Sequence, residues 1–162
     1  MSQTPWWKGA RGEWYVVAQG GLFLLVALGP RTWPGLPAWT PPFTWLGWVG
    51  GAALLLAGGL LAVAGVFSLG TNLTPVPYPK DDATLVESGA YRFVRHPIYS
   101  GGIIAAFGWG LLVHGWLTLV YALLLFVFFD VKSRREERWL REKYPDYPAY
   151  QKRVRKLIPF VY

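Results

Sequence analysis

Long runs of uncharged apolar residues limit what this chain can fold into. Four stand out, at about residues 14–29, 45–69, 98–113 and 116–131. Each approaches the ~17–25 residues that a helix needs to cross a bilayer, and the last two are the shortest. Hydrophobic residues make up 53% of the chain, above the roughly 45–50% of soluble domains. We therefore expect an all-α, polytopic membrane helical bundle of about four transmembrane helices, forming one domain over residues 1–162.

The last two apolar runs predict a tight antiparallel helical hairpin, because only His114 and Gly115 separate them. The fourth run has no stop signal at Asp130, which we expect at headgroup depth near Lys132. Helix-forming residues continue through Lys143, so one long helix should leave the membrane and form a cytoplasmic C-terminal helical extension. Small residues allow close helix packing in membranes. In the second run we expect this of Gly47, Gly50, Gly51, Gly58 and Gly59.

Lysine and arginine are distributed unevenly between the connecting segments. Fifteen of the sixteen lie in the N-terminal tail, in the loop of residues 70–96, or from Lys132 onward, and the first loop holds only Arg31. The positive-inside rule then places both termini and the second loop in the cytoplasm of an integral membrane protein, expected in the cell inner membrane. Anionic lipid headgroups account for the net charge of +7 without any nucleic-acid partner.

Metal chemistry has little support in the sequence. The chain has no cysteine and only two histidines, which do not form a pair within one helix. Polar residues able to bind a ligand gather instead at the end of the second loop and in the cytoplasmic tail.

The segment Arg95-His96-Pro97 is the first candidate binding site. Proline suits the first turn of a helix, and the free N–H groups at a helix N-terminus favour an anion. The alternative is that Arg92 and Arg95 reach lipid phosphates while Pro97 only starts a helix.

Glu136 and Glu137 form the second candidate. A hairpin would bring them close to His96, although 40 positions separate His96 from Glu136. Glu137 is explained by an exposed i,i+4 pair with Arg141. Glu136 has no basic residue four positions later, so it could bind ribose hydroxyls or an ammonium group, or simply lie exposed on the helix.

In this order, the motifs resemble those of the isoprenylcysteine carboxyl methyltransferase and phospholipid methyltransferase superfamily of integral membrane enzymes. The signature Gly-x-Tyr-(x)3-Arg-His-Pro-x-Tyr-x-Gly stands at residues 89–101, Glu-Glu-x-x-Leu at 136–140, Tyr-x-x-Tyr at 147–150 and Ile-Pro at 158–159. The resemblance covers about residues 69–160 and implies a cofactor-binding half at about 70–162. It implies methyl transfer from S-adenosyl-L-methionine to a lipophilic acceptor, either a prenylcysteine-like carboxylate or a phospholipid amine, at the cytoplasmic membrane face.

The resemblance also implies which residues contact the ligands. On the cofactor side these are Thr84, Leu85, Val86, Tyr91, His96, Pro97, Ile98, Tyr99 and Glu136. Tyr91 and Tyr99 would flank the sulfonium cation. On the substrate side, the arginine that the family carries four positions before its first glutamate falls on Lys132, which keeps the charge but loses the bidentate fork. Arg95 is a second substrate-side candidate. The identity of the acceptor and the oligomeric state are not determined by the sequence.

Two other functions are compatible with the sequence. NADPH-dependent membrane sterol reductases resemble the same half, but they usually carry Asn before the second tyrosine of the signature and Asp-Glu in place of Glu-Glu. Ile98 and the pair Glu136-Glu137 favour a methyltransferase. A non-catalytic membrane scaffold would keep the fold alone, and the intact His96, Tyr99 and Glu136 argue against it.

Overall fold

The computed structural model describes residues 8, 9 and 11–162. Its α-helices are α1 (Glu13–Leu28), α2 (Phe43–Leu69), α3 (Pro97–Leu112), α4 (Trp116–Lys143) and α5 (Tyr147–Arg153). Two short 3-10 helices, η2 (Gly70–Asn72) and η3 (Gly89–Arg92), lie in the second loop. Within these residues no strand forms, and extended backbone pairs only at an isolated bridge between Val94 and Arg155. The expected all-α class is confirmed, whereas α5 was not anticipated as a separate helix.

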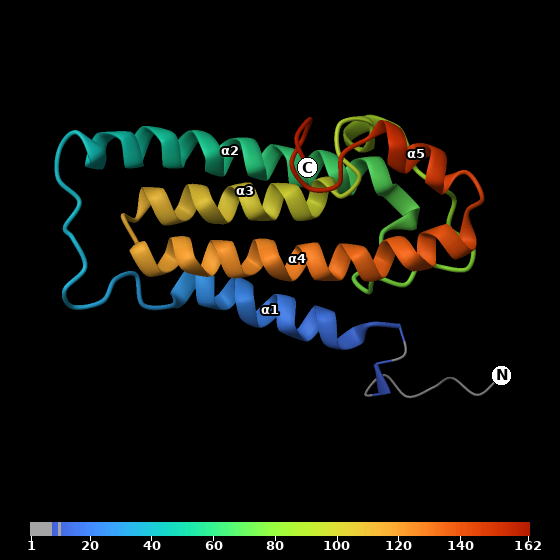
Figure 1. Ribbon diagram of the computed structural model, residues 1–162, viewed down its shortest axis with the longest axis horizontal. Coiled ribbons are helices and arrows are strands. Elements are labelled where there is room, and N and C mark those ends of the chain that lie inside the picture. The colour runs from blue at the N-terminus through green and yellow to red at the C-terminus, as the bar shows by residue number, and fades with distance from the viewer. Residues whose placement is uncertain (1–7, 10) are drawn as a thin grey trace.

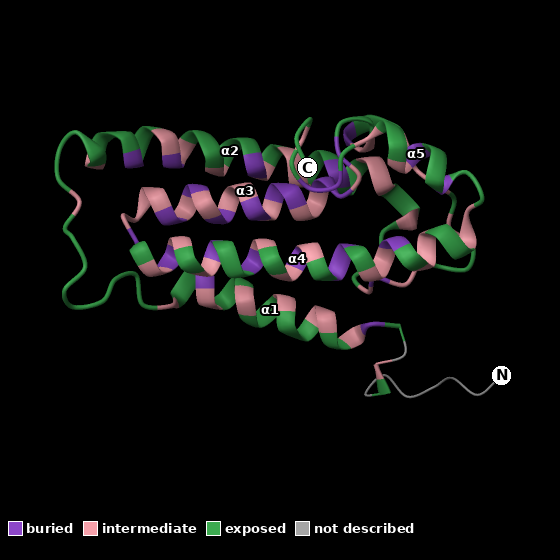
Figure 2. Ribbon diagram, in the orientation of Figure 1, coloured by how far each residue is buried: buried purple, intermediate pink, exposed green. Residues whose placement is uncertain are grey.

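The four longer helices lie side by side, with α3 between α2 and α4, and α1 against α4 (Figure 1). The outward faces of α1 and α2 are exposed along much of their length and carry large apolar side chains (Figure 2). By length and composition, α2 and α4 can cross a membrane. Helices α1 and α3 have 16 residues each, a rise of about 24 Å against a hydrocarbon core of about 30 Å. The number of spans therefore stays a prediction.

Helix α2 meets α3 through glycines. The buried residues of α2 are all glycine: Gly47, Gly51, Gly58 and Gly65. A Cβ built at Gly58 would lie 2.5 Å from both the Ala105 nitrogen and the Gly101 oxygen, so the two backbones are in direct contact. The contact is the same from α3, because a Cβ built at Gly101 would lie 2.4 Å from the Gly58 oxygen. This packing fixes where α3 begins relative to the end of α2.

The glycine expectation is correct for Gly47, Gly51 and Gly58 and wrong for Gly50 and Gly59. A Cβ at either of the last two would meet nothing within 4 Å. Successive residues of a helix point about 100° apart, so adjacent glycines cannot both face one neighbour. The interface also uses Gly65, where a Cβ would lie 3.0 Å from Pro97 Cγ.

The C-terminal segment folds back over the bundle (Figure 1) and pairs with Asp130 of α4. The Asp130 carboxylate binds Lys156 Nζ, Arg134 at 2.8 Å and the Tyr162 hydroxyl at 2.9 Å. The expectation that Asp130 simply sits near Lys132 is therefore incomplete, because its partners come from the next turn of α4 and from the tail. Leu157 of the same segment is buried in the apolar core.

Candidate active site

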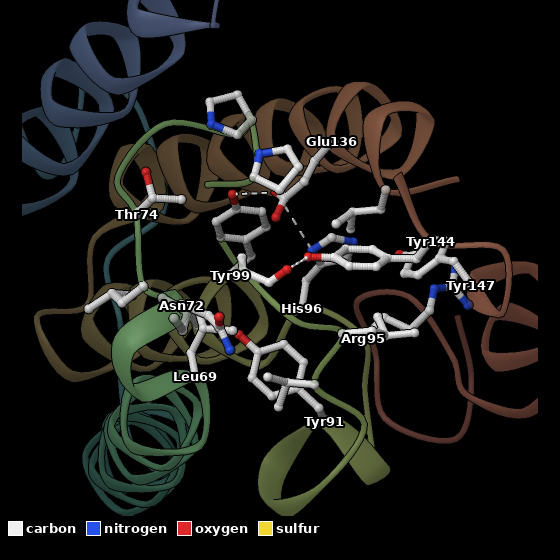
Figure 3. A pocket seen from close by; sticks show the side chains of 18 of the residues that line it. Leu69, Asn72, Thr74, Tyr91, Arg95, His96, Tyr99, Glu136, Tyr144 and Tyr147 are labelled. Atoms are coloured by element: carbon white, nitrogen blue, oxygen red, sulfur yellow. Dashed lines mark hydrogen bonds and ion pairs between the residues drawn. The ribbon is translucent and has the colours of Figure 1, made fainter. Parts of the chain in front are cut away.

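A cavity of about 320 Å³ lies where the loop of residues 70–96 crosses α2, α3, α4 and α5 (Figure 3). Small-molecule sites typically enclose about 300–1,000 Å³. The cavity is lined by all of the sequence-predicted cofactor and substrate residues except Pro97: Thr84, Leu85, Val86, Tyr91, Arg95, His96, Ile98, Tyr99, Lys132 and Glu136. Pro97 is buried as the first residue of α3, where its ring lies against Gly65.

The loop wall of the cavity is held by hydrogen bonds rather than by regular secondary structure. Asn72, just after α2, accepts a bond from the Thr84 backbone nitrogen at 3.1 Å and donates to the Thr84 hydroxyl at 3.4 Å. Tyr144, at the end of α4, donates to the Ala83 carbonyl at 2.7 Å. The apolar side chains of the next two residues, 85 and 86, therefore face the cavity from a fixed segment.

His96 stands at the start of α3 between two carboxylates. Its backbone oxygen accepts bonds from the Ser100 nitrogen and hydroxyl, both at 2.9 Å, which fixes the first turn. Its ring nitrogens lie 3.2 Å from Glu137 Oε1 and 3.8 Å from Glu136 Oε2. The imidazole also stacks on the Tyr99 ring, with centroids 5.3 Å apart. His96 is consequently held on three sides within the cavity wall.

The two adjacent glutamates have different environments. Glu136 Oε2 accepts a 2.7 Å hydrogen bond from the Tyr99 hydroxyl, and Oε1 forms none among the residues that the structure describes. The Glu136 side chain is 23% exposed and lines the cavity beside Tyr99 (Figure 3). One carboxylate oxygen is thus available to a ligand.

Glu137, in contrast, is buried, and its oxygens accept bonds from three donors. These are Arg95 Nε at 2.8 Å, His96 Nε2 at 3.2 Å and Gln151 Nε2 at 2.8 Å. The expected exposed pair with Arg141 is therefore wrong. The sequence could not show that α5 packs against this turn of α4 and encloses Glu137.

Arg95 does not extend to lipid phosphates. Its side chain is 10% exposed, and besides Glu137 it binds the backbone carbonyls of Gln151 at 3.1 Å and of Val154. Only Nη2 forms no hydrogen bond within the described part of the chain. Arg95 borders the cavity, and most of its donors fix α5 against α3.

Three tyrosines close the cavity on the side of α5. Tyr150 donates to the Tyr91 carbonyl at 2.7 Å, which connects α5 to η3. Burial raises the pKa of Tyr91 well above its ordinary value, and the negative charge of Glu136 adds to this. Burial likewise raises the pKa of Tyr147 and Tyr150. These phenols remain neutral near pH 7 and offer O–H groups and aromatic surface rather than charge.

Lys132 reaches the cavity from the opposite side, where α4 meets α1. It is 1% exposed, and its ammonium donates to Gln19 Oε1 at 2.6 Å. The ammonium also lies 4.9 Å from the Tyr99 ring centroid, so in this structure the cation over that ring is Lys132. Lys132 has no carboxylate within ion-pair distance in the described residues. Sequence reasoning missed Gln19, although an amide inside an apolar run is a signal, since it needs a partner there.

The donor set fits the S-adenosyl-L-methionine that the motifs imply. Glu136 offers an uncommitted carboxylate oxygen for hydroxyl or ammonium groups, and Leu85, Val86 and Ile98 supply apolar surface. Neutral Tyr91 adds an aromatic group that can border a sulfonium. A metal would have little to bind, because the described residues contain no cluster of three or more potential ligands.

Comparisons with known proteins agree with the motifs. The family model described as phospholipid methyltransferase matches residues 46–147. Human protein-S-isoprenylcysteine O-methyltransferase is 32% identical over 151 residues, which cover 91% of this chain and 51% of that protein. The cobalt-zinc-cadmium resistance protein CzcN of Cupriavidus metallidurans is 30% identical over 155 residues, covering 91% of this chain and 62% of its own length. The chain therefore spans about half the length of the human relative.

A solved structure shares the fold. The eukaryotic intramembrane Ras methyltransferase, isoprenylcysteine carboxyl methyltransferase, superposes with a TM-score of 0.66 over 99% of this chain and 55% of that one. The sequence identity in this comparison is 22%, so it establishes the helical arrangement alone.

Proposed function

The chain belongs to the phospholipid methyltransferase family, and on that premise we propose that it transfers a methyl group from S-adenosyl-L-methionine to a lipophilic acceptor. The observation that carries the proposal is the contrast between two neighbouring carboxylates. Glu137 is saturated by three internal donors, whereas Glu136 presents a free oxygen to a cavity lined by the family signature. The second carboxylate therefore keeps one oxygen for a ligand inside the cavity.

The cofactor side of the proposed site comprises Thr84, Leu85, Val86, Tyr91, His96, Ile98, Tyr99 and Glu136, with Pro97 fixing the start of α3. When bound, S-adenosyl-L-methionine supplies an electrophilic methyl group on a sulfonium centre. Glu136 would accept hydrogen bonds from its ribose hydroxyls or ammonium group. Tyr99 orients Glu136 through its hydroxyl, and His96 holds the same carboxylate from the other side.

The acceptor side is proposed at Lys132, with Arg95 able to contribute only through Nη2. A buried ammonium without a direct ion-pair partner attracts an anion and repels a cation, and Glu136 compensates the Lys132 charge only from a distance. Of the two acceptor classes, a prenylcysteine-like carboxylate therefore fits better than a phospholipid amine. A carboxylate oxygen would form the new C–O bond while the electron pair of the C–S bond stays on sulfur, so no general base is required. The protein must chiefly align the two groups and exclude water.

The proposed setting is the cytoplasmic face of the inner membrane. Helices α2 and α4 are long and apolar enough to span, and exposed apolar side chains cover the outer faces of α1 and α2. The cavity lies at the end of the bundle that also carries α5 and the basic tail (Figure 1). A lipophilic acceptor can then enter sideways from the bilayer while the cofactor enters from the cytoplasm.

Ligand-induced stabilisation of the purified protein tests the cofactor assignment. A ligand at 100 times its Kd stabilises the folded state by about 2.7 kcal/mol, so S-adenosylhomocysteine should raise the thermal midpoint clearly. His96→Ala and Glu136→Ala should abolish most of that shift, while Glu142→Ala, on an exposed turn of the same helix, should keep it. A shift with NADPH but none with S-adenosylhomocysteine would indicate an oxidoreductase instead, and no shift with either would indicate a scaffold.

Methyl transfer itself is measured with radiolabelled S-adenosyl-L-methionine. The acceptor panel should include N-acetyl-S-farnesylcysteine and a phosphatidylethanolamine vesicle. We expect label in the farnesylcysteine methyl ester. Incorporation into neither acceptor class, from protein that binds S-adenosylhomocysteine, would contradict the proposed activity.

A further inference from the structure

One wall of the cavity comes from α1, outside the segment that carries the methyltransferase motifs. Gln19 is the α1 residue that lines the cavity. Helix α1 packs on α4, with Val26 as its buried residue and Leu22 and Phe23 against the core side chains. Gln19 approaches Lys132 to 2.6 Å. Gln19 is half-buried, and an amide among apolar residues is costly unless it is partnered.

The chemistry of the pair fixes which atoms remain available. An ammonium has donors only, so Gln19 must present its oxygen to Lys132. The amide nitrogen of Gln19 therefore keeps two N–H groups that form no hydrogen bond among the described residues. Lys132 keeps further N–H donors of its own and forms no direct ion pair within the described residues, although the negative charge of Glu136 acts on it from a greater distance. Two helices thus place unused donors and a positive charge without a direct ion-pair partner side by side in the cavity, where the nearest compensating charge is that of Glu136.

We propose that Gln19 and Lys132 together bind the carboxylate of the methyl acceptor, which makes Gln19 a specificity-determining residue. This inference rests on the proposed function. A guanidinium would supply two parallel donors from one side chain, and a lysine cannot. Here the second donor comes from the Gln19 amide on another helix. Specificity for an anionic acceptor is therefore divided between α1 and α4.

The pair of Gln19 and Lys132 would also distinguish the acid substrate from the ester product. The acceptor acid carries a negative charge, and methylation converts it to a neutral ester. A positively charged pair with spare donors binds the acid well and gains little from the ester. The same charge disfavours amine headgroups, which would place a second cation beside Lys132. The acid-to-ester affinity ratio is therefore the property that Gln19 should control.

The test compares N-acetyl-S-farnesylcysteine with its methyl ester in the full-length protein in detergent. Binding is measured for both, and KM and kcat are measured for the acid. A hydrogen bond to a charged group contributes enough that Gln19→Leu should weaken acid binding roughly tenfold or more. Ester binding, S-adenosylhomocysteine binding and kcat should change little. Gln19→Glu should weaken acid binding further, because its carboxylate would neutralise Lys132.

Two variants separate this role from simple anchoring of α1. Gly20→Ala is the matched control, since a Cβ there meets nothing within 4 Å, and it should behave as wild type. The double variant Gln19→Ala with Lys132→Arg should recover acid binding relative to Gln19→Leu. The arginine guanidinium supplies two parallel N–H donors from one side chain and so replaces the donor lost with Gln19.

An unchanged acid-to-ester ratio in Gln19→Leu, with normal S-adenosylhomocysteine binding, would overturn the inference and leave the proposed function intact. Methyl transfer to phosphatidylethanolamine and not to the farnesylcysteine acid would also overturn the inference and leave the proposed methyltransferase function intact. If the wild-type protein does not bind S-adenosylhomocysteine at all, the proposed function is overturned, and this inference with it.

Discussion

Gly58 and Gly59 are neighbours in α2 that should respond oppositely to the same substitution. A Cβ at Gly58 would lie 2.5 Å from two backbone atoms of α3, whereas a Cβ at Gly59 would meet nothing within 4 Å. Both alanines remove the same backbone freedom from the unfolded chain. Any difference between the two variants therefore measures the α2–α3 contact itself.

The size of the effect follows from the geometry. Ordinary Cβ contacts begin at 3.4 Å, so Gly58→Ala requires the backbones to move apart by about 1 Å, an overpacking that typically costs about 1–3 kcal/mol. Neither obstructing atom belongs to a side chain that could rotate away. Replacing glycine by alanine in a helix gains about 0.8–1 kcal/mol. Gly59→Ala should thus be slightly stabilising and Gly58→Ala destabilising.

Thermal unfolding in detergent, followed by circular dichroism, measures the difference. For a chain of this size 1 kcal/mol corresponds to about 2–4 °C, so the two midpoints should differ by several degrees. Gly101→Ala, which meets the same contact from α3, should resemble Gly58→Ala. Equal midpoints for the Gly58 and Gly59 variants would refute the direct backbone contact.

Other substitutions test the buried charges and the loop connection. Glu137→Gln leaves the buried Arg95 cation uncompensated and should cost about 3–5 kcal/mol in denaturant unfolding, whereas Glu142→Gln, on an exposed turn of the same helix, should be neutral. Tyr150→Phe removes the hydrogen bond to the Tyr91 carbonyl and should cost about 1 kcal/mol, with weaker S-adenosylhomocysteine binding in calorimetry. Burial raises the pKa of Tyr150 above the ordinary tyrosine value of about 10, so the unfolded chain ionises there first and stability falls as pH rises above about 10. The phenylalanine variant should lose part of that alkaline decline in pH-dependent melting; an unchanged slope would contradict the burial argument.

The helices were predictable from the sequence because each depends on local information. Uncharged runs bounded by Pro30, Pro97 and the pair His114-Gly115 mark four helix boundaries within a residue or two: the end of α1, both ends of α3 and the start of α4. The extension of α4 through Lys143 was also predictable, since the run of helix formers is unbroken. Helix α5 was not, because seven residues carry too little periodicity to separate a helix from a turn.

The family could also be read from the order of short motifs, and the match over residues 46–147 confirms it. Motifs identify residue types, however, and not their partners. The i,i+4 spacing separates Glu136 from Glu137 but predicts the wrong partner for Glu137, because an exposed pair with Arg141 gives no sign of the three internal donors that saturate it. These donors reach Glu137 because α5 and the start of α3 pack against one turn of α4.

By itself the sequence determined the apolar surroundings of the bundle, its four long helices and the family, because hydrophobic length and motif spacing are properties of the chain. What only the tertiary structure decided is which side chains meet. Adjacent glycines in α2 point in different directions, so Gly58 touches α3 and Gly59 does not. Gln19 and Lys132 are 113 positions apart and become neighbours only when α1 packs on α4. Contacts of this kind depend on helix rotation and packing, which no local pattern encodes.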